Sequence, residues 1–509
     1  MPQVEKEKGV DEAPYQVPYI LLYSPPFNSP NKAPDTMVAE IITTISPTTN
    51  KPILTRHGLP PDEILRLGTT AQKAFKSYKQ SHPTLESRQK VVTKALEILS
   101  ERQDALAAEL TEQMGRPISY TVKEITTALK RAEYMNRIAP EVLGRDTPGD
   151  PEKGFSRYIR KEPVGVVLVI FAWNYPYLIL VNSLIPALLA GNAVILKPSP
   201  QTPTIVEHIL DIFTTAGLPG HVIQYLHCGS PTDLRPLILS PDVNHICFTG
   251  SVAAGIAIQQ IAASRVSCSV GLELGGKDPA YVRPDVDPAW VAEEIVDGAI
   301  FNSGQSCCAI ERVYVHEDIY EAFVAEVKKV LSNYRLGDPM DKSTHVGPVV
   351  SVRSKEAILN QVSDALAAGA KDETPQNETF ASLPTKSEGN FVAPVLLTGV
   401  SHAMSVMKDE TFGPVIPVQK VSGDEEAVAL MNDSQFGLTA SIWTKDVERG
   451  EELTRQVEAG TVFVNRADFP SPDLAWTGWK DSGKGVTLSR FGFDQFVKLK
   501  SVHLKDYPK

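Results

Sequence analysis

Cysteine is scarce in this sequence, and no grouping of cysteine with histidine suggests a metal site. The 509 residues contain five cysteines, at positions 228, 247, 268, 307 and 308. They form no CxxC pair, and no histidine cluster stands at the spacing of zinc ligands. A small, odd number of cysteines argues against a disulfide framework. We therefore expect a reducing compartment, the cytoplasm, and no bound metal.

Positive charge is also in deficit. The chain has 50 lysines and arginines against 61 aspartates and glutamates, which gives a net charge of −11 at pH 7. Nucleic acids and anionic membranes attract basic surfaces, so neither is an expected partner. Chemistry on a small molecule is the function class that remains.

The sequence also lacks a long unbroken apolar run. Residues 163–196 carry no charged side chain, but Pro163, Pro176 and Gly191 are among the residues that interrupt them. A membrane-spanning helix needs about 20 apolar residues in a row. The pattern instead predicts a strand at 166–171, a helix at 178–190 and a strand at 193–197 within a buried parallel sheet. The N-terminus has early acidic residues and does not match a signal peptide.

What the chain does contain is a regular alternation of strands and helices. Helices are predicted at 64–80, 84–114 and 119–139, followed by an alternation that continues beyond residue 270, with strands at 166–171, 193–197, 221–225, 245–248 and 266–274. Such repetition predicts a doubly wound α/β sheet. We expect a second doubly wound α/β domain at about 274–480, because 509 residues exceed what one hydrophobic core normally holds.

Three segments fall outside this alternation. Residues 1–40 are rich in proline and are expected to form an irregular arm. Residues 369–390 are expected to form a polar surface loop. Residues 494–504 alternate as a strand does, so we expect them to join a sheet elsewhere in the chain or across a subunit boundary.

Two adjacent cysteines follow a helix predicted at 288–299. The stretch Phe301-Asn302-Ser303-Gly304-Gln305-Ser306-Cys307-Cys308-Ala309 places both thiols on a turn. A thiol attacks only as its thiolate, and free cysteine ionises near pH ~8.5, so a catalytic cysteine needs backbone N–H groups, a cation or a base nearby. The alternative is that these cysteines are small buried hydrophobic residues.

Four loops at the ends of predicted strands carry further candidate chemistry. Gly250 and Ser251 stand between a strand and a helix, where a phosphate can bind, although such a turn can also be only a tight connection. Lys197 ends a strand at the sheet edge that binds ligands, or is simply solvated. Asn174 can direct its amide at an oxyanion, or only form a turn. Glu273, in an apolar segment beside two glycines, is a candidate general base with a raised pKa, or a member of a buried salt bridge.

Together these motifs resemble those of the aldehyde dehydrogenase superfamily over about residues 45–509. The resemblance rests on the order and separation of Trp173-Asn174, Lys197-Pro198, Phe248-Thr249-Gly250-Ser251, Leu272-Glu273-Leu274-Gly275-Gly276-Lys277, Gly304-Gln305-Ser306-Cys307, Glu410-Thr411-Phe412-Gly413-Pro414 and Ser482-Gly483. It implies an NAD(P)-binding domain at 41–145 and 164–272 and a catalytic domain at 273–480. It also implies a small β oligomerisation arm at 146–163 and 481–509, in a homodimer or homotetramer.

The resemblance assigns roles to the matched residues. Cys307, which fits the family pattern Gly-Gln-x-Cys, corresponds to the nucleophile that attacks the aldehyde. Asn174 and the Cys307 N–H correspond to the donors that hold the oxyanion, and Glu273 to the base that activates water to hydrolyse the thioester. The implied cofactor positions are Trp173, Lys197, Ser199, Gly250, Ser251, Glu410 and Phe412. The implied substrate tunnel includes Tyr175, Ser306, Cys308 and Arg466.

Several alternatives follow from the same residues. Arg466 either pairs with Asp468, the simpler expectation, or meets a distal carboxylate of a semialdehyde substrate. A CoA-acylating enzyme of this superfamily would be expected to lack Glu273, and a non-catalytic binding protein to have lost Cys307. The family's usual Pro-Phe-Gly-Gly is replaced by Ala475-Trp476-Thr477-Gly478, which affects the substrate entrance.

The resemblance also bears on the choice between NAD and NADP. Members that prefer NAD commonly have a glutamate three residues after the ribose lysine, and this sequence has Pro200 there. Without that carboxylate a 2′-phosphate is not repelled, so we expect both cofactors to be used, with NAD somewhat favoured.

Overall fold

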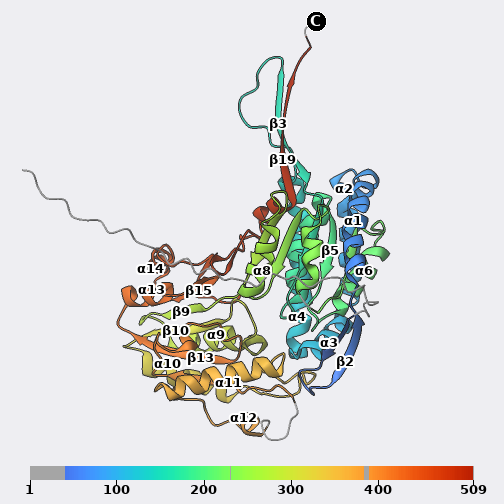
Figure 1. The fold of residues 1–509 in the computed structure, drawn as a ribbon. Coiled ribbons are helices and arrows are strands. Elements are labelled where there is room, and N and C mark those ends of the chain that lie inside the picture. The colour runs from blue at the N-terminus through green and yellow to red at the C-terminus, as the bar shows by residue number, and fades with distance from the viewer. Residues whose placement is uncertain (1–39, 230, 383–388, 508–509) are drawn as a thin grey trace, which may run out of the picture. The chain divides into compact units, whose positions relative to one another are not determined.

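The structure, a computed structural model, describes residues 40–229, 231–382 and 389–507. The irregular arm expected at 1–40 therefore lies outside the described residues, apart from its last position. The described chain forms two large sheets with helices packed against them, and a separate two-stranded ribbon (Figure 1). The predicted α/β class is confirmed.

The first large sheet has the strand order β18-β8-β7-β4-β5-β6. Its strands are β4 (Val166–Ile170), β5 (Ala193–Lys197), β6 (Ile223–Tyr225), β7 (His245–Thr249), β8 (Ser269–Glu273) and β18 (Gly483–Lys484). The strands from β4 to β8 pair in parallel, and β18 adds an antiparallel edge beside β8. The continuous apolar runs of β4 and β5 are buried along their whole length, as predicted.

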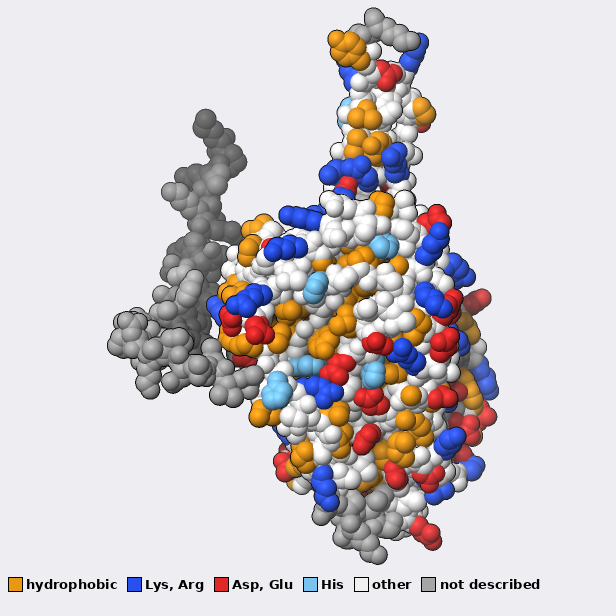
Figure 2. All heavy atoms as spheres, turned by 90° about the vertical axis from the view of Figure 1, so that its right-hand side faces the viewer, with side chains coloured by type: hydrophobic (Ala, Val, Ile, Leu, Met, Phe, Trp, Pro, Cys, Tyr) orange, Lys and Arg blue, Asp and Glu red, His pale blue; other side chains and the backbone are white. Residues whose placement is uncertain are grey.

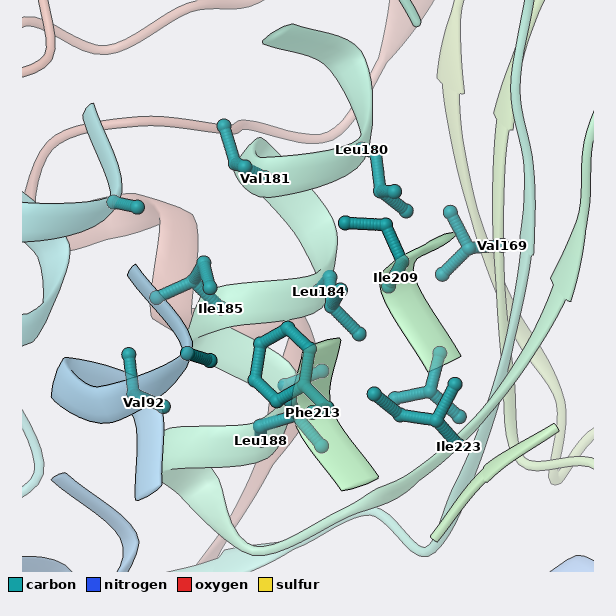
Figure 3. Packing of buried hydrophobic residues seen from close by; sticks show 14 of the residues in the cluster. Val92, Val169, Leu180, Val181, Leu184, Ile185, Leu188, Ile209, Phe213 and Ile223 are labelled. Atoms are coloured by element: carbon teal, nitrogen blue, oxygen red, sulfur yellow. The ribbon is translucent and has the colours of Figure 1, made fainter. Parts of the chain in front are cut away.

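Helices cover this sheet on two faces. They are α1 (Pro61–Ser81), α2 (Leu85–Glu101), α3 (Gln103–Met114), α4 (Ile118–Val142), α5 (Pro176–Ala190), α6 (Thr204–Thr215), α7 (Arg235–Leu239) and α8 (Val252–Ala262), with a 3-10 turn, η1 (Pro231–Leu234), before α7. Alternate residues of β4 face the two layers: Val167 and Val169 pack into the α2–α6 core, and Leu168 packs into the α1–α7–α8 core. Figure 3 shows how Leu184 and Phe213 interdigitate in the first of these cores.

The single helix predicted at 84–114 is wrong, because it divides at Arg102. Thr84 caps α2, accepting from the Ser87 N–H, and Gly115 closes α3 in a left-handed conformation. Between them Arg102 leaves the helical region at φ −100° and ψ 0°. The break redirects the chain, and Leu106 stays buried in the core shared with α4.

The second large sheet has the strand order β11-β12-β13-β10-β9-β15-β16. Its strands are β9 (Asp278–Val282), β10 (Ile310–His316), β11 (Lys371–Asp372), β12 (Val395–Thr398), β13 (Val415–Val421), β15 (Thr439–Trp443) and β16 (Thr461–Val464). Its helices are α9 (Pro288–Ile300), α10 (Tyr320–Ser332), α11 (Val352–Ala367), α12 (Glu378–Ser382), α13 (Asp424–Asn432) and α14 (Val447–Thr454), with a 3-10 turn, η3 (Ser405–Met407). The loop predicted at 369–390 is partly structured, because β11 pairs with the open edge of β12.

The predicted strand at 494–504 begins later than expected. Residues Arg490–Phe496 form the 3-10 helix η4, which buries Phe493 and Phe496, and β19 (Val497–Lys505) follows. β19 pairs in antiparallel register with β3 (Phe155–Pro163) of the same chain. The resulting ribbon extends away from the two sheets (Figures 1 and 2).

Two short antiparallel strand pairs complete the described fold. They are β1 (Ile41–Ile45) with β2 (Pro52–His57), and β14 (Phe436–Gly437) with β17 (Trp479–Lys480). No helix in the described ranges is long and apolar enough to cross a membrane.

Candidate active site

The loop that carries the paired cysteines begins with a left-handed turn. After α9 the chain forms the 3-10 turn η2 (Phe301–Gly304), in which Asn302 (φ 54°) and Ser303 (φ 57°) adopt left-handed conformations. Gly304 continues at φ +71°, and a Cβ there would lie 2.2 Å from the Gly413 carbonyl oxygen. Only glycine fits this position, because both the backbone angle and the space exclude a side chain.

Gln305 fixes the same loop to its surroundings. Its side-chain Nε2 donates to the Asn302 carbonyl at 3.1 Å, and its Oε1 accepts from the Val350 N–H at 2.8 Å. The next residues, Ser306 to Cys308, therefore start from a rigid support, and the thiols lie on a turn as the sequence predicted.

A cavity of about 530 Å³ opens beside this turn. Its walls include all three predicted catalytic residues, Cys307, Asn174 and Glu273. They also include the four predicted tunnel residues, which are Tyr175, Ser306, Cys308 and Arg466. Side chains from both large sheets are thus brought together at one place.

Asn174 is buried and held at both its backbone and its side chain. Its Nδ2 donates to the Gln305 carbonyl at 3.3 Å, while the Arg116 guanidinium donates to its main-chain carbonyl. Arg116 also donates to Asn302 Oδ1 at 3.1 Å and forms an ion pair with Glu124. The amide is therefore preorganised on the wall of the cavity next to Cys307.

Arg116 and Glu124 were not singled out from the sequence. Both are buried, and Glu124 Oε1 accepts from the Tyr177 N–H at 2.9 Å, which ties α4 to the start of α5. The only sequence signal for Glu124 was a charged residue within the helix predicted at 119–139, and such residues are more often solvated. Arg116 lies between two predicted helices, where the sequence carried no signal.

Glu273 ends β8 among hydroxyl groups. Thr249 Oγ1 donates to its carboxylate at 3.3 Å, and Thr487 Oγ1 donates to the other oxygen. Burial raises the pKa of Glu273 above its usual value, and these two hydrogen bonds oppose the shift only in part. A carboxylate with a raised pKa that faces the cavity matches the predicted general base.

Cys308 lies on the protein side of the turn. Its Sγ is 2.8 Å from Asp468 Oδ1, and the same oxygen accepts from Ser306 Oγ at 3.0 Å. A hydrogen bond with Cys307, then burial, then the Asp468 charge raise the pKa of Cys308 well above its usual value, so this thiol stays protonated. Burial also raises the pKa of Asp468 to about 6.

Arg466 does not form the ion pair with Asp468 that the sequence suggested. Among the described residues its guanidinium instead lies over the Phe469 ring, 3.6 Å from the ring centroid. Asp468 is occupied by Ser306 and Cys308 because its left-handed backbone (φ 47°) turns the carboxylate toward the cysteine loop.

The predicted cofactor residues of the first sheet gather at the carboxyl ends of β4, β5 and β7. Lys197 is the last residue of β5, and burial lowers its pKa. Ser199 follows, with its hydroxyl accepting from the Gln201 N–H at 3.2 Å. After β7 comes Gly250, where a Cβ would lie 2.7 Å from the Phe248 ring, and then Ser251, which caps α8.

Glu410 and Phe412 reach the same region from the second sheet. Glu410 Oε1 accepts from the Gly276 N–H at 3.0 Å, and a Cβ on Gly275 would lie 2.5 Å from this carboxylate. Burial, and then repulsion by Glu311, raise the pKa of Glu410 to about 7. Phe412 meets Trp173 edge to face, with ring centroids 5.7 Å apart.

This edge suits a dinucleotide. Phosphate and ribose groups are held in proteins by lysines, by the N-termini of helices and by backbone that glycine leaves accessible, and all three are present here. The sequence missed the support beneath it: Glu311 accepts from the Thr411 and Phe412 N–H groups at 2.7 Å and 2.8 Å and pairs with Lys277 at 2.7 Å.

Comparisons with known proteins point to one family. A model of the aldehyde dehydrogenase family matches residues 34–502. An aldehyde dehydrogenase of Paenarthrobacter nicotinovorans is 35% identical over 466 residues, which are 91% of this chain and 99% of that protein. An NADP(+) succinate-semialdehyde dehydrogenase of Mycolicibacterium paratuberculosis is 33% identical over 463 residues, 91% and 96% of the two chains. The crystal structure of an NAD-dependent aldehyde dehydrogenase from Sinorhizobium meliloti superposes with a TM-score of 0.86 at 30% identity, covering 92% of this chain and 91% of that one.

Proposed function

Since the chain belongs to the aldehyde dehydrogenase family, we propose that it oxidises an aldehyde to the carboxylic acid with Cys307 as nucleophile. The observation that carries this proposal is the convergence of Cys307, Asn174 and Glu273 on one cavity. A nucleophile, an amide donor and a carboxylate of raised pKa are the groups that this reaction needs.

The first step is attack by the Cys307 thiolate on the aldehyde carbon. The carbonyl π electrons move to oxygen, and the oxyanion accepts hydrogen bonds from Asn174 Nδ2 and from the Cys307 N–H. Among the described residues no group accepts from that N–H. Asn174 uses one amide hydrogen on Gln305, so the other is available. Removing one such donor typically lowers the rate by about 10²–10³-fold.

The bound nicotinamide cofactor, NAD or NADP, supplies the acceptor for the hydride that leaves the tetrahedral carbon. The residues that we propose hold it are Lys197 and Ser199 at the adenosine side, Gly250 and Ser251 at the pyrophosphate, and Trp173, Glu410 and Phe412 at the nicotinamide half. Lys197 is buried and Glu410 half-buried at this edge, and both can exchange hydrogen bonds with ribose hydroxyls.

Hydrolysis completes the reaction. Glu273 takes a proton from water, the hydroxyl oxygen adds to the thioester carbon, and the C–S bond breaks to return Cys307 as thiolate. The presence of Glu273 also favours hydrolysis over transfer of the acyl group to CoA. A water proton can leave for Glu273 near neutral pH because burial raises the pKa of this carboxyl.

Replacement of each cysteine in turn tests the proposal. We expect Cys307→Ala to lower aldehyde-dependent NAD(P)H production by about 10³-fold or more, since no other thiolate replaces it. Cys308→Ala should keep much of the activity, because Cys308 stays protonated against Asp468. Near-normal turnover by the Cys307 variant would show that the nucleophile is a different residue.

We propose further that the enzyme is a homodimer or homotetramer of the cytoplasm. The ribbon of β3 and β19 supports assembly, because Leu499 and Leu504 are 68% and 52% exposed on it. The five cysteines, all unpaired, support a reducing compartment.

A further inference from the structure

In the part of the chain that the structure describes, one buried cation of the active-site cavity forms no ion pair. Arg131 of α4 is only 6% exposed and lines the cavity with Cys307. Its Nη1 donates to Asn182 Oδ1 at 3.4 Å and its Nη2 to the Pro470 carbonyl at 3.1 Å. Its Nε is buried without any hydrogen-bond partner. Among the described residues no carboxylate lies within ion-pair distance of Arg131, and Glu273, Glu124 and Asp468 act on its charge only from farther away.

Arg116, on the same cavity wall, is an arginine whose charge is paired within the protein, and it provides a comparison for Arg131. It is also buried, but it forms an ion pair with Glu124 and donates to Asn302 and Asn174. A guanidinium stays charged in proteins, and a buried charge without a partner is costly. Burial lowers the pKa of Arg131, which reflects this cost. Arg131 is thus arranged to receive an anion from outside the protein.

We propose that Arg131 binds a carboxylate at the far end of the substrate, so that the enzyme prefers aldehydes that also carry an acid group. This inference rests on the proposed function of Cys307. A guanidinium carries its N–H donors in a fixed planar fork, and such a fork binds the two oxygens of a carboxylate.

Two features of the cavity narrow the class of anion. Arg466 is exposed and its guanidinium lies over Phe469, so solvent weakens its attraction for an anion, whereas Arg131 acts where water is largely excluded. The cavity wall also contains the carboxyl groups of Glu294, Asp297 and Asp468, which oppose a second negative charge. A carboxylate monoanion therefore suits the cavity better than a phosphate dianion.

The first measurement uses the unaltered enzyme. kcat/KM is compared along a series of ω-carboxy-aldehydes and along neutral aldehydes of equal length, with one phosphorylated aldehyde added. We expect the best carboxy-aldehyde to exceed its neutral counterpart by about 100-fold, the range of one charge-assisted contact. Equal values for the acid and the neutral aldehyde, or a higher value for the phosphorylated one, would overturn the inference.

Variants then assign the preference to one residue. Arg131→Met removes the charge and keeps most of the side-chain volume. It should raise KM for the carboxy-aldehyde, so that kcat/KM for this substrate falls by about 100-fold. The kcat/KM for neutral aldehydes should change by less than about threefold. Arg131→Lys should recover part of the loss. The control Arg466→Met should leave the preference unchanged. An equal loss for acid and neutral substrates in Arg131→Met would mean a merely structural role and would also overturn the inference.

The outcome can be separated from that of the proposed function. If Arg131→Met does not fold, competitive inhibition of the unaltered enzyme decides: a dicarboxylate of the preferred length should inhibit, and its neutral diester should not. Inhibition by both to the same degree would contradict the inference. An enzyme that oxidises neutral aldehydes with no preference keeps the proposed function and loses this inference. An enzyme that oxidises no aldehyde loses both.

Discussion

At the scale of single residues, the raised pKa of Glu273 predicts how turnover depends on pH. The general base acts only when deprotonated, so turnover falls as pH drops through its pKa. Burial raises that pKa, and the falling limb of kcat against pH should therefore lie above the value of about 4.3 that an exposed glutamate would give. Full steady-state turnover maintained down to that value would contradict the role of base.

Substitution of Glu273 separates the two halves of the reaction. Glu273→Gln should lower steady-state turnover by about 10²–10⁴-fold, because the amide cannot take a proton from water. Hydride transfer precedes this step, so a single burst of NAD(P)H close to the amount of enzyme should survive in rapid-mixing experiments. Loss of the burst together with turnover would place Glu273 in the earlier step.

Cofactor choice also depends on single carboxylates. The sequence, with Pro200 in place of a glutamate, predicts that NAD is favoured over NADP by no more than about 100-fold in kcat/KM. The structure adds Glu40, whose Oε2 accepts from the Gly229 N–H at 3.0 Å, and whose charge opposes the lowering of the Lys197 pKa. Glu40 thus stands near the lysine proposed to hold the adenosine ribose, where it would repel a 2′-phosphate.

Two variants test that placement. Glu40→Gln should shift the NAD to NADP ratio toward NADP by about tenfold, and Pro200→Glu should shift it toward NAD by a similar factor. Glu63→Gln, which removes an exposed carboxylate from the first turn of α1, serves as control. An unchanged ratio in Glu40→Gln would mean that the carboxylate lies too far from the ribose.

The sequence indicated the residues that we propose to react, but not the residues that hold them in place. Cys307, Glu273 and Asn174 follow strands or a helix at positions where local chemistry is informative, and the structure brings all three to one cavity. Arg131 lies on the helix predicted at 119–139 and Arg116 just before it, and nothing local in the sequence shows that Arg116 forms an ion pair with Glu124 while Arg131 forms none within the described residues. The packing of α4 against α5 determines which groups these arginines contact, and that packing depends on the whole fold.

At the scale of elements, the left-handed turn of η2 should be sensitive to one methyl group. We expect Gly304→Ala to lower kcat/KM by about 100-fold or more, because the Cβ would collide with the Gly413 carbonyl 2.2 Å away and displace the cysteine turn. The matched control is Gly149→Ala, which also has a positive φ (+80°) but has nothing within 4 Å of the new Cβ. It should cost only about 1 kcal/mol of stability and leave the activity intact.

The control also defines what would contradict this expectation. If Gly304→Ala and Gly149→Ala have the same activity and the same Tm, the turn is not held in place by close packing. Thermal unfolding and kcat/KM of both variants, measured side by side, decide the matter.

Elements with a strong period were predicted well, and their ends were not. β5 was predicted at its observed bounds, because four apolar residues stand between a glycine turn and a lysine. The break at Arg102 and the start of β19 at Val497 were missed. Each is set by distant partners: the α4 core in the first case, and the burial of Phe493 and Phe496 in the second. Hydrophobic periodicity does not carry that information.

At the scale of the whole molecule, the ribbon should decide the oligomeric state. Figure 2 shows apolar side chains on it outside the body of the protein. Leu499 of β19 is 68% exposed. Leu499→Glu should convert the assembly to a smaller species in light scattering, since an interface does not accept an unpaired charge. Leu65→Glu, at a residue 44% exposed on α1, is the control and should leave the mass unchanged. Identical masses for all three proteins would remove the ribbon from the interface.

The antiparallel edge strand β18 has a consequence for how the protein is made. Most of the first sheet belongs to residues before 274, but β18 lies at Gly483–Lys484, and the Leu274 N–H donates to the Ser482 carbonyl at 2.9 Å. Thr487, which donates to Glu273, comes from the same late segment. A ribosome must therefore translate almost the entire message before Glu273, the proposed general base, has both of its hydrogen-bond partners. Nascent chains and prematurely terminated products carry the reactive cysteine without a finished hydrolytic site, so catalytic competence marks a chain completed to its end.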